Sequence, residues 1–259
     1  MAGGRSRHRK SPRTLGNSEE LWIYGHHAVS AALKNFNRMA KRVLFLQDNL
    51  SQVEPLLTEI DIKAEPVSRD QLAKILPFGA VHQGIAALMS ALPTITLEDI
   101  CADGKMLPNA LIVLLDRVSD PQNIGAIIRS AAVLGAMAVI IQDRNAPQIT
   151  GVIAKAASGG IEHVPLVRVT NLSRAIETLK KNRFWCIGLD SEAEGDLQQV
   201  KRPSHTVLVL GAEGAGLRRL VRENCDELIR IEGSGVLTSL NVSNAAAVAL
   251  YALRQVPNG

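Results

Sequence analysis

The stretch ALIVLLDRVSDPQNIGAIIRSAAVLGAMAVIIQ, from Ala110 to Gln142, decides the fold. It opens with a nearly continuous apolar run, which is typical of a strand in a parallel sheet that is covered on both faces. A loop follows, and then a helical segment that ends at Gly135, because glycine is favoured just past a helix C-terminus. The run AVIIQ predicts the next strand. Together these segments predict a βαβ unit.

The same alternation continues toward the C-terminus. Further helices are predicted for ITGVIAKAAS, NLSRAIETLKKN and GLRRLVRENC, and further strands for VPLVRV, FWCIGLD, HTVLVLG and ELIRIE. An apolar helix near the C-terminus closes the chain. Strands that alternate with helices indicate an α/β domain with a mostly parallel sheet, here over residues 110–259.

A smaller α/β unit precedes this domain. Residues 20–90 alternate short apolar runs with amphipathic segments, beginning with LWIY and ending with GIAALMS. Residues 91–109 contain two prolines and little periodicity, so we expect a linker with one helical turn.

Charge and composition narrow the class of protein. The formal net charge of +4 favours a polyanionic partner only weakly, and aromatic residues, at 3%, are too few for binding that depends mainly on base stacking. We expect residues 1–19 to be a disordered basic tail, because they combine glycine and serine with five cations. That tail is either solubilising or an arm that contacts RNA. Its cations are Arg5, Arg7, Arg9, Lys10 and Arg13.

Other features exclude whole classes of function. The three cysteines, Cys101, Cys186 and Cys225, show neither metal-ligand spacing nor a disulfide framework, which fits a reducing cytoplasm. The N-terminus lacks the apolar core of a signal peptide, and no apolar run is long enough to span a membrane. A nucleotide-dependent oxidoreductase is disfavoured because the chain has no G-x-G-x-x-G.

The unusual residues lie on three loops, after Asp116, Leu210 and Ile231. Ligands of open parallel sheets bind beyond the carboxyl ends of the strands, where these loops are expected. In the first loop, we expect Asn123 just before the helix, as a cap or pointing outward, with Arg129 one turn further on. Alone, this pair is also compatible with an ordinary cap and a surface arginine.

The second and third loops give stronger indications. Glu213 stands among Gly211, Gly214 and Gly216, which fits either a tight turn or a ligand site whose backbone can come close. The third loop places five polar residues around one helix start, more than capping requires. The surplus indicates a polar ligand held by side chains and free backbone N–H groups. These residues are Thr238, Ser239, Asn241, Ser243 and Asn244.

Three blocks together resemble the SpoU (TrmH-like) RNA 2′-O-ribose methyltransferases of the SPOUT superfamily: DRVSDPQNIGAIIRSAAVLGA, LVLGAEGAGL and IRIEGSGVLTSLNVSNAAAVALY. KAASGGIEHVPLVRV matches a family segment between them. In the smaller unit, IYGHHAVSAAL and AVHQGIAA resemble the substrate-binding domain of bacterial 23S rRNA guanosine 2′-O-methyltransferases, whose fold is like that of kink-turn-binding ribosomal proteins. Related rRNA and tRNA enzymes share that domain.

The resemblance implies a deep trefoil knot, S-adenosylmethionine as cofactor, and an obligate homodimer with each site near the interface. By position, it implies cofactor contacts at Gly211, Ile231 and Leu240, largely through backbone, and leaves Ser243 or Asn244 to cap the last helix. The implied catalytic set is Asn123, Arg129, Glu213, Ser239 and Asn241.

The implied reaction is S-adenosylmethionine-dependent 2′-O-methylation of a ribose in RNA, with a guanosine of 23S rRNA as the expected target. The alternatives are a tRNA ribose methyltransferase and a non-catalytic RNA-binding assembly protein. Arg129 is the family's proposed base, although arginine stays protonated in proteins, so it either binds a phosphate and favours the alkoxide or loses its proton in an unusual site. Arg230 stands where the family often has proline. Other candidate RNA contacts, each also explained as a solvated charge, are Arg117, Arg144, Arg218, Arg219 and Arg222.

Overall fold

The computed structural model describes residues 20–60, 62–144, 147–201, 203–233, 235–236 and 239–254. The predicted basic tail, residues 1–19, and Thr238 lie outside the described residues. Within them, no helix is both long and apolar enough to cross a lipid bilayer.

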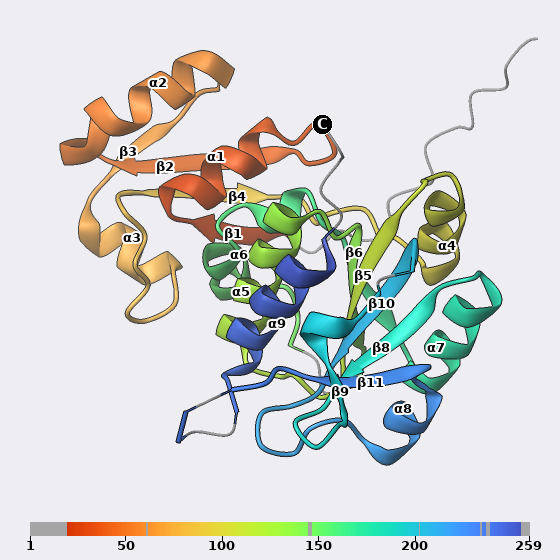
Figure 1. Cartoon of the computed structure of the whole chain (residues 1–259). Helices are drawn as coiled ribbons and strands as arrows, with labels where there is room; N and C mark the ends of the chain where they lie inside the picture. Colours follow the sequence, from red (N-terminus) through yellow and green to blue (C-terminus); the bar gives the residue numbers. More distant parts are fainter. Residues whose placement is uncertain are drawn as a thin grey trace, which may run out of the picture.

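The N-terminal unit, residues 20–90, is a four-stranded sheet with three helices (Figure 1). The strand order is β1-β4-β2-β3, and only β2 and β3 run parallel. This confirms the predicted alternation of strands and helices. The elements are β1 (Leu21–Tyr24), α1 (His26–Lys34), β2 (Ala40–Leu46), α2 (Leu50–Ile60), β3 (Glu65–Val67), α3 (Arg69–Ile75) and β4 (Ile85–Met89).

The segment expected to be a linker contains a nine-residue helix, α4 (Leu97–Lys105). The segment is therefore helical over more than the one turn that we expect from the sequence. Thr96 and Asp99 form a capping box, in which each side chain accepts a hydrogen bond from the other's backbone N–H, and this fixes the helix start. Ile100 and Cys101 are buried against the C-terminal sheet.

The C-terminal domain is built on a seven-stranded sheet in the order β7-β6-β5-β10-β8-β11-β9, with every neighbouring pair parallel. The parallel α/β fold is thereby confirmed. Its strands are β5 (Ala110–Leu115), β6 (Ala138–Gln142), β7 (Leu166–Val169), β8 (Trp185–Leu189), β9 (Gly195–Asp196), β10 (His205–Leu210) and β11 (Glu227–Arg230). Its helices after α4 are α5 (Pro121–Leu134), α6 (Gly151–Ala157), α7 (Leu172–Lys181), α8 (Arg219–Asn224) and α9 (Val242–Leu253).

Two layers of helices cover this sheet (Figure 1). Alternate residues of β5 point to opposite faces: Leu111 and Val113 pack with α5, α6 and α9, whereas Ile112 and Leu114 pack with α4 and α7. Helices cover both faces of the sheet and exclude water from β5, which explains why this strand is apolar throughout.

The N-terminal unit packs directly on the α5–α6 layer. Ile23 and Val29 belong to the same buried cluster as Ile153 of α6. Gly151, at the start of α6, has no room for a side chain because the Trp22 carbonyl oxygen and the ring of Tyr24 occupy that space. Glycine at position 151 thus lets the N-terminal unit and the C-terminal domain approach each other closely.

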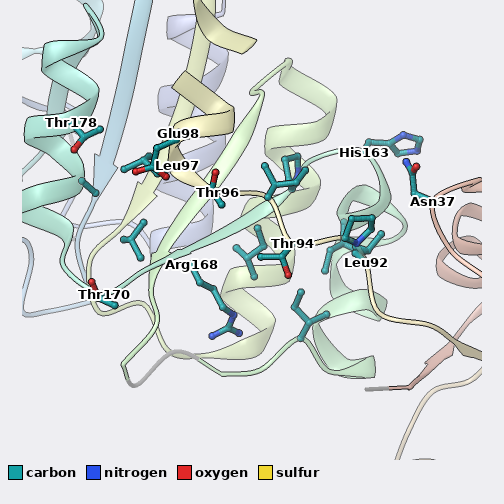
Figure 2. A pocket seen from close by; sticks show the side chains of 18 of the residues that line it. Asn37, Leu92, Thr94, Thr96, Leu97, Glu98, His163, Arg168, Thr170 and Thr178 are labelled. Atoms are coloured by element: carbon teal, nitrogen blue, oxygen red, sulfur yellow. The ribbon is translucent and has the colours of Figure 1, made fainter. Parts of the chain in front are cut away.

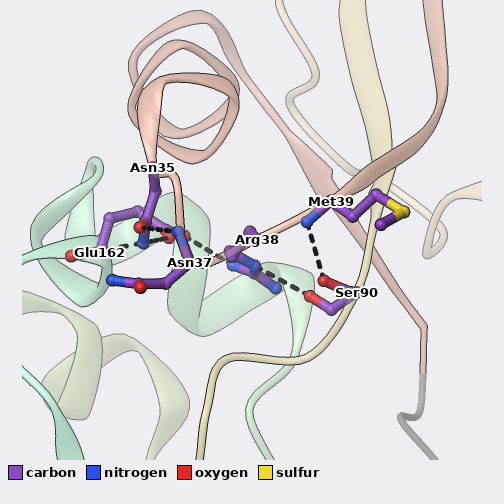
Figure 3. Close-up of polar contacts among 6 residues, drawn as sticks. All are labelled: Asn35, Asn37, Arg38, Met39, Ser90 and Glu162. Carbon is purple, nitrogen blue, oxygen red and sulfur yellow. Dashed lines mark hydrogen bonds and ion pairs between the residues drawn. The ribbon is translucent and has the colours of Figure 1, made fainter. Parts of the chain in front are cut away.

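A buried ion pair completes this domain contact (Figure 3). Arg38 Nη1 lies 2.6 Å from Glu162 Oε1, and both side chains are only 1% exposed. Glu162 follows α6 in a short 3-10 helix, η2 (Gly160–Glu162). Asn35 Nδ2 donates to the other carboxylate oxygen at 2.8 Å, and Arg38 Nε donates to the Ser90 carbonyl oxygen at 2.9 Å. The carboxylate and the guanidinium are thus hydrogen-bonded as well as paired, as a buried charge pair requires.

Candidate functional site

The three predicted loops start at the same edge of the sheet. β5, β10 and β11 are parallel, so their carboxyl ends point the same way; β5 and β10 are neighbours, and β8 separates β10 from β11. The expectation that these loops share one edge is confirmed.

The loop after β10 is a tight turn that folds back on itself. Ala212 and Gly216 form an isolated bridge, with the Gly216 N–H donating to the Ala212 carbonyl oxygen at 2.9 Å. A side chain at Gly211 would overlap the backbone of Gly216, so position 211 must be glycine. Gly214 and Gly216 have positive φ, 74° and 60°, which only glycine adopts readily. The turn presents the Glu213 side chain to solvent.

Glu213 lies beside the start of α9. Asn241 Nδ2 donates to Glu213 Oε2 at 3.3 Å, which joins the second loop to the third. Asn241 is also the N-cap of α9: its Oδ1 accepts from the Ser243 N–H at 2.9 Å and from Ser243 Oγ at 2.6 Å. The expectation that Ser243 or Asn244 would cap this helix is wrong, because Asn241 uses one amide atom for the cap and the other for Glu213.

The remaining residues of the third loop flank this pair. Ser239 is exposed, Leu240 is 48% exposed and Ile231 is half-buried. Exposed or half-buried apolar side chains on this loop fit an adenosyl group, which needs an apolar face. The residues at the strand ends therefore suit S-adenosylmethionine.

The first loop differs from its prediction. α5 begins at Pro121, and Asp120 is its N-cap, accepting from the backbone N–H groups of Gln122 and Asn123 at 3.2 and 3.1 Å. Asn123 is thus the third residue of the helix, not the residue before it. Aspartate followed by proline is a helix-start signal, so the boundary was readable from the sequence.

Arg129 lies further along α5, in a separate hollow. It is exposed and lines a cavity of about 440 Å³, which lies between α1 and the segment from α6 to η2. His27, Ala31 and His163 also line this cavity. Within one copy of the chain, Glu213 and Asn241 are hydrogen-bonded to each other, and neither lines the cavity at Arg129.

Two family models match the chain. One, the SpoU rRNA Methylase family, matches residues 110–251, and the other, RNA 2′-O ribose methyltransferase substrate binding, matches residues 22–94. The chain belongs to the SpoU rRNA methylase family.

Relatives and solved structures agree with this assignment. The chain is 40% identical to the 23S rRNA (guanosine-2′-O-)-methyltransferase RlmB of Haemophilus influenzae, over 88% of this chain and 95% of that protein. It is 40% identical to RlmB of Photobacterium profundum, over 90% and 97%. The SpoU methyltransferase AviRb from Streptomyces viridochromogenes, solved with AdoMet, is similar with a TM-score of 0.75 and 26% identity, over 90% of this chain and 89% of that one.

One hydrogen-bonded network at the carboxyl ends of the strands was not predicted from the sequence. Asp116, fully buried after β5, pairs with Arg218 Nε at 2.7 Å and accepts from the Arg218 backbone N–H at 2.8 Å. Arg218 Nη2 also donates to Gln142 Oε1 at 2.8 Å. Arg218 therefore braces the ends of β5 and β6 against the glycine turn.

Other arginines of this SpoU chain are also engaged. Arg219 pairs with Glu223 and Arg222 with Asp190, both at 2.9 Å. Arg230, where the family often has proline, donates through Nη1 to the carbonyl oxygens of Ala193 and Glu194 at 2.7 and 3.2 Å. It thereby holds the neighbouring loop where a proline could not.

Another cavity lies away from the strand-end loops (Figure 2). It has a volume of about 840 Å³ and lies between residues 92–98, the β7 edge and the start of α7. Arg168 and His163 are among its lining residues. Among the described residues that line it, there is none of the predicted catalytic or cofactor-binding side chains.

Proposed function

We propose that this chain transfers a methyl group from S-adenosylmethionine to the ribose 2′-hydroxyl of a guanosine in 23S rRNA. The observation that carries the proposal is the hydrogen bond between Asn241 and Glu213, which joins two motif loops at the strand ends. It lies within the segment matched by the SpoU family model. The named activity of the RlmB relatives, which align over nearly their whole length, supports the same substrate.

The chain's own residues have distinct parts in this proposal. S-adenosylmethionine supplies an electrophilic methyl group when bound. The backbone at Gly211, Ile231 and Leu240 holds the cofactor, while Ser239 and Asn241 orient the target ribose. Asn123 and Glu213 shape the polar wall between them. Because Asn241 is fixed both by the helix cap and by Glu213, its amide is preorganised.

Loss of the 2′-hydroxyl proton is assigned to Arg129. Arginine remains protonated in ordinary surroundings, so we favour a role in which its guanidinium binds the adjacent phosphate and stabilises the developing alkoxide, while the 2′-hydroxyl proton passes to solvent water. The alternative, a deprotonated Arg129 that acts as the base, requires the same planar fork at the same position. Both therefore predict failure of a lysine replacement.

We also propose that the chain acts as a homodimer. The outward sides of α5 and α9 carry exposed apolar side chains, Val133, Val248 and Tyr251. A second copy on this face would bury them and bring Arg129, one turn before Val133, to the contact between copies. The hollow around Arg129 would then be completed by the partner, which accounts for its separation from Asn241 within one chain.

Two further parts of the proposal concern topology and place. The family resemblance implies a deep trefoil knot, and we propose it for the domain whose strand order is β7-β6-β5-β10-β8-β11-β9. Action on ribosomal RNA in the cytoplasm fits the three free cysteines, which the structure leaves unpaired.

A tRNA substrate is the main alternative. The TrmH/SpoU tRNA modifying enzyme of A. aeolicus is 26% identical, with a TM-score of 0.51, but covers only 61% of this chain. The RlmB relatives cover the N-terminal unit as well, which favours rRNA. A non-catalytic assembly protein is the second alternative, and the intact pairing of Asn241 with Glu213 argues against it.

The test is to incubate the protein with labelled S-adenosylmethionine and, separately, undermodified 23S rRNA and total tRNA, and then to map ribose methylation. We expect one 2′-O-methylated guanosine in 23S rRNA. Methylation of tRNA alone would keep the chemistry and overturn the substrate. Cofactor binding without transfer to either RNA would favour the assembly role.

A further inference from the structure

Two phenylalanines of the N-terminal unit are wholly exposed. The chain has four phenylalanines, and Phe45 and Phe184 are buried, but Phe36 and Phe78 are 104% and 107% exposed. Single exposed apolar residues are common, so exposure alone does not indicate function. The surroundings of the two rings, however, are different.

Phe78 stands on a loop, residues 77–83, that is shaped before any partner binds. The loop follows α3 and projects from the N-terminal unit (Figure 1). The Ala80 N–H donates to the Pro77 carbonyl oxygen at 3.0 Å, which closes a turn under the ring, and Gly79 has a φ of 73°. Val81 in the same loop is exposed as well. The loop therefore presents an apolar tip on an ordered backbone.

The base of this loop is tied to the C-terminal domain. Gln83 has a φ of 53°, unusual for a residue with a side chain, and its Oε1 accepts from the His26 N–H at 3.1 Å and from Lys155 Nζ at 2.6 Å. His26 begins α1 and Lys155 belongs to α6. Gln83 thereby fixes the loop to both parts of the molecule, so a ligand held at Phe78 would have a defined position relative to the strand-end loops.

Positive charge distinguishes Phe78 from Phe36. Arg69 and Lys74 lie on α3, just before the loop, and neither forms an ion pair within the described part of the chain. Arg69 is close enough to His82 to help lower the pKa of that imidazole, after burial. Near Phe36, three of the four basic residues between positions 34 and 42 are bound to carboxylates, as the pairs Lys34–Glu59, Arg38–Glu162 and Arg42–Glu65.

We propose that Phe78 stacks on an unpaired base of the RNA substrate, with Arg69 and Lys74 contacting the adjoining phosphates. An exposed ring on a loop that follows a helix with unpaired cations is suited to single-stranded RNA, because every base offers a π face and every linkage a negative charge. The inference rests on the proposed function, since it assumes that the substrate is RNA. It adds the contact that holds the RNA away from the reacting ribose.

The test compares full-length Phe78→Ala with wild type and with the matched control Phe36→Ala. Dissociation constants are measured with undermodified 23S rRNA, together with kcat and KM for methyl transfer at saturating S-adenosylmethionine. For Phe78→Ala, we expect binding to weaken by roughly 5- to 150-fold, with KM raised and kcat kept, the range for one lost base stack. Phe36→Ala should bind within about twofold of wild type. Neither change should lower thermal stability, because neither ring is packed.

A second pair of variants separates stacking from mere apolar contact. Phe78→Trp should restore binding and Phe78→Leu should not, because leucine has no π face. Wild-type affinity in Phe78→Ala, or full rescue by leucine, would overturn the inference while the transfer activity of the wild type still supports the proposed function. Loss of self-association in Phe78→Ala without a change in RNA affinity would also overturn it, by assigning the ring to a protein contact. If the wild type itself transfers no methyl group to RNA, the proposed function fails first.

Discussion

The domain contact at Glu162 and the strand-end pair at Glu213 each depend on a carboxylate beside a nitrogen donor, but water reaches only one of them. Glu162 and its partner Arg38 are 1% exposed, and every oxygen of the carboxylate has a donor. Glu213 is exposed, and its hydrogen bond to Asn241 is longer, at 3.3 Å. The first arrangement is complete without a ligand, whereas the second leaves polar atoms open to one. Stability and function are thus expected to respond to different mutations.

The largest effect is expected from Glu162→Ala. The variant leaves the Arg38 guanidinium buried without its counter-charge, which should lower the free energy of unfolding by about 3–5 kcal/mol. Denaturant unfolding of the full-length protein measures this loss.

The matched control is Glu65→Ala. Glu65 pairs with Arg42 at 2.7 Å, but both side chains are nearly half exposed. Water can replace the lost partner there, so the loss of unfolding free energy should be much smaller than for Glu162→Ala. Equal losses in the two variants would contradict the idea that burial makes the domain contact a stability element.

The reverse pattern is expected for Arg129→Lys, which should slow methyl transfer strongly without affecting stability. Arg129 is exposed on α5, and lysine keeps its charge and helix propensity but lacks the planar fork. We expect methyl transfer to fall by about 10²–10³-fold with an unchanged unfolding curve. Arg183→Lys is the control, because Arg183 is exposed in a turn after α7, far along the chain from the motif loops. Near-normal turnover by Arg129→Lys would rule out both roles proposed for this residue.

A mixed effect is expected for Asn241→Ala, since Asn241 both caps α9 and carries the site amide. The lost cap should cost about 1 kcal/mol, and the lost site amide should slow transfer by about tenfold or more. Asn171→Ala is a close control: Asn171 caps α7 by accepting from the Arg174 N–H at 3.1 Å. It should show a similar loss of stability with transfer unchanged. If both variants slow transfer equally, the effect belongs to capping and not to the site.

The same comparison explains how much the sequence could predict. Strand ends and helix ends depend on local signals, and Gly135 adopts the left-handed conformation expected of a helix C-terminus, with a φ of 78°. The prolines on either side of α4 indicate a linker, although Thr96 and Asp99 form the capping box that starts this helix. The predicted position of Asn123 is also wrong, because Asp120, one turn earlier, is the N-cap residue of α5.

Contacts that join distant parts of the chain had no signal in the sequence. Arg38 and Glu162 are 124 residues apart, and Asp116 and Arg218 are 102 apart. Nothing near Arg218 distinguishes it from an arginine in solvent until the strands bring Asp116 beside it. The catalytic and cofactor assignments depended on the family resemblance, and for most of those residues they remain predictions that the variants above test.

The smallest effect is expected for His82, whose side chain is half-buried, between the buried Glu162 and the exposed Glu213. Its Nδ1 accepts the Gly84 N–H at 3.1 Å, and burial, with the charge of Arg69, holds the pKa of the imidazole below its ordinary value of 6.5. The folded state therefore binds fewer protons than the unfolded state below pH 6.5. The contribution of neutral His82 to the free energy of unfolding is complete above pH 6.5 and is lost as the pH falls through the lowered pKa. His82→Asn keeps an acceptor but does not titrate. Unfolding measured from about pH 8 to pH 5 should show the wild type losing stability relative to this variant, and parallel profiles would mean that the loop responds to protons as the exposed parts of the surface do.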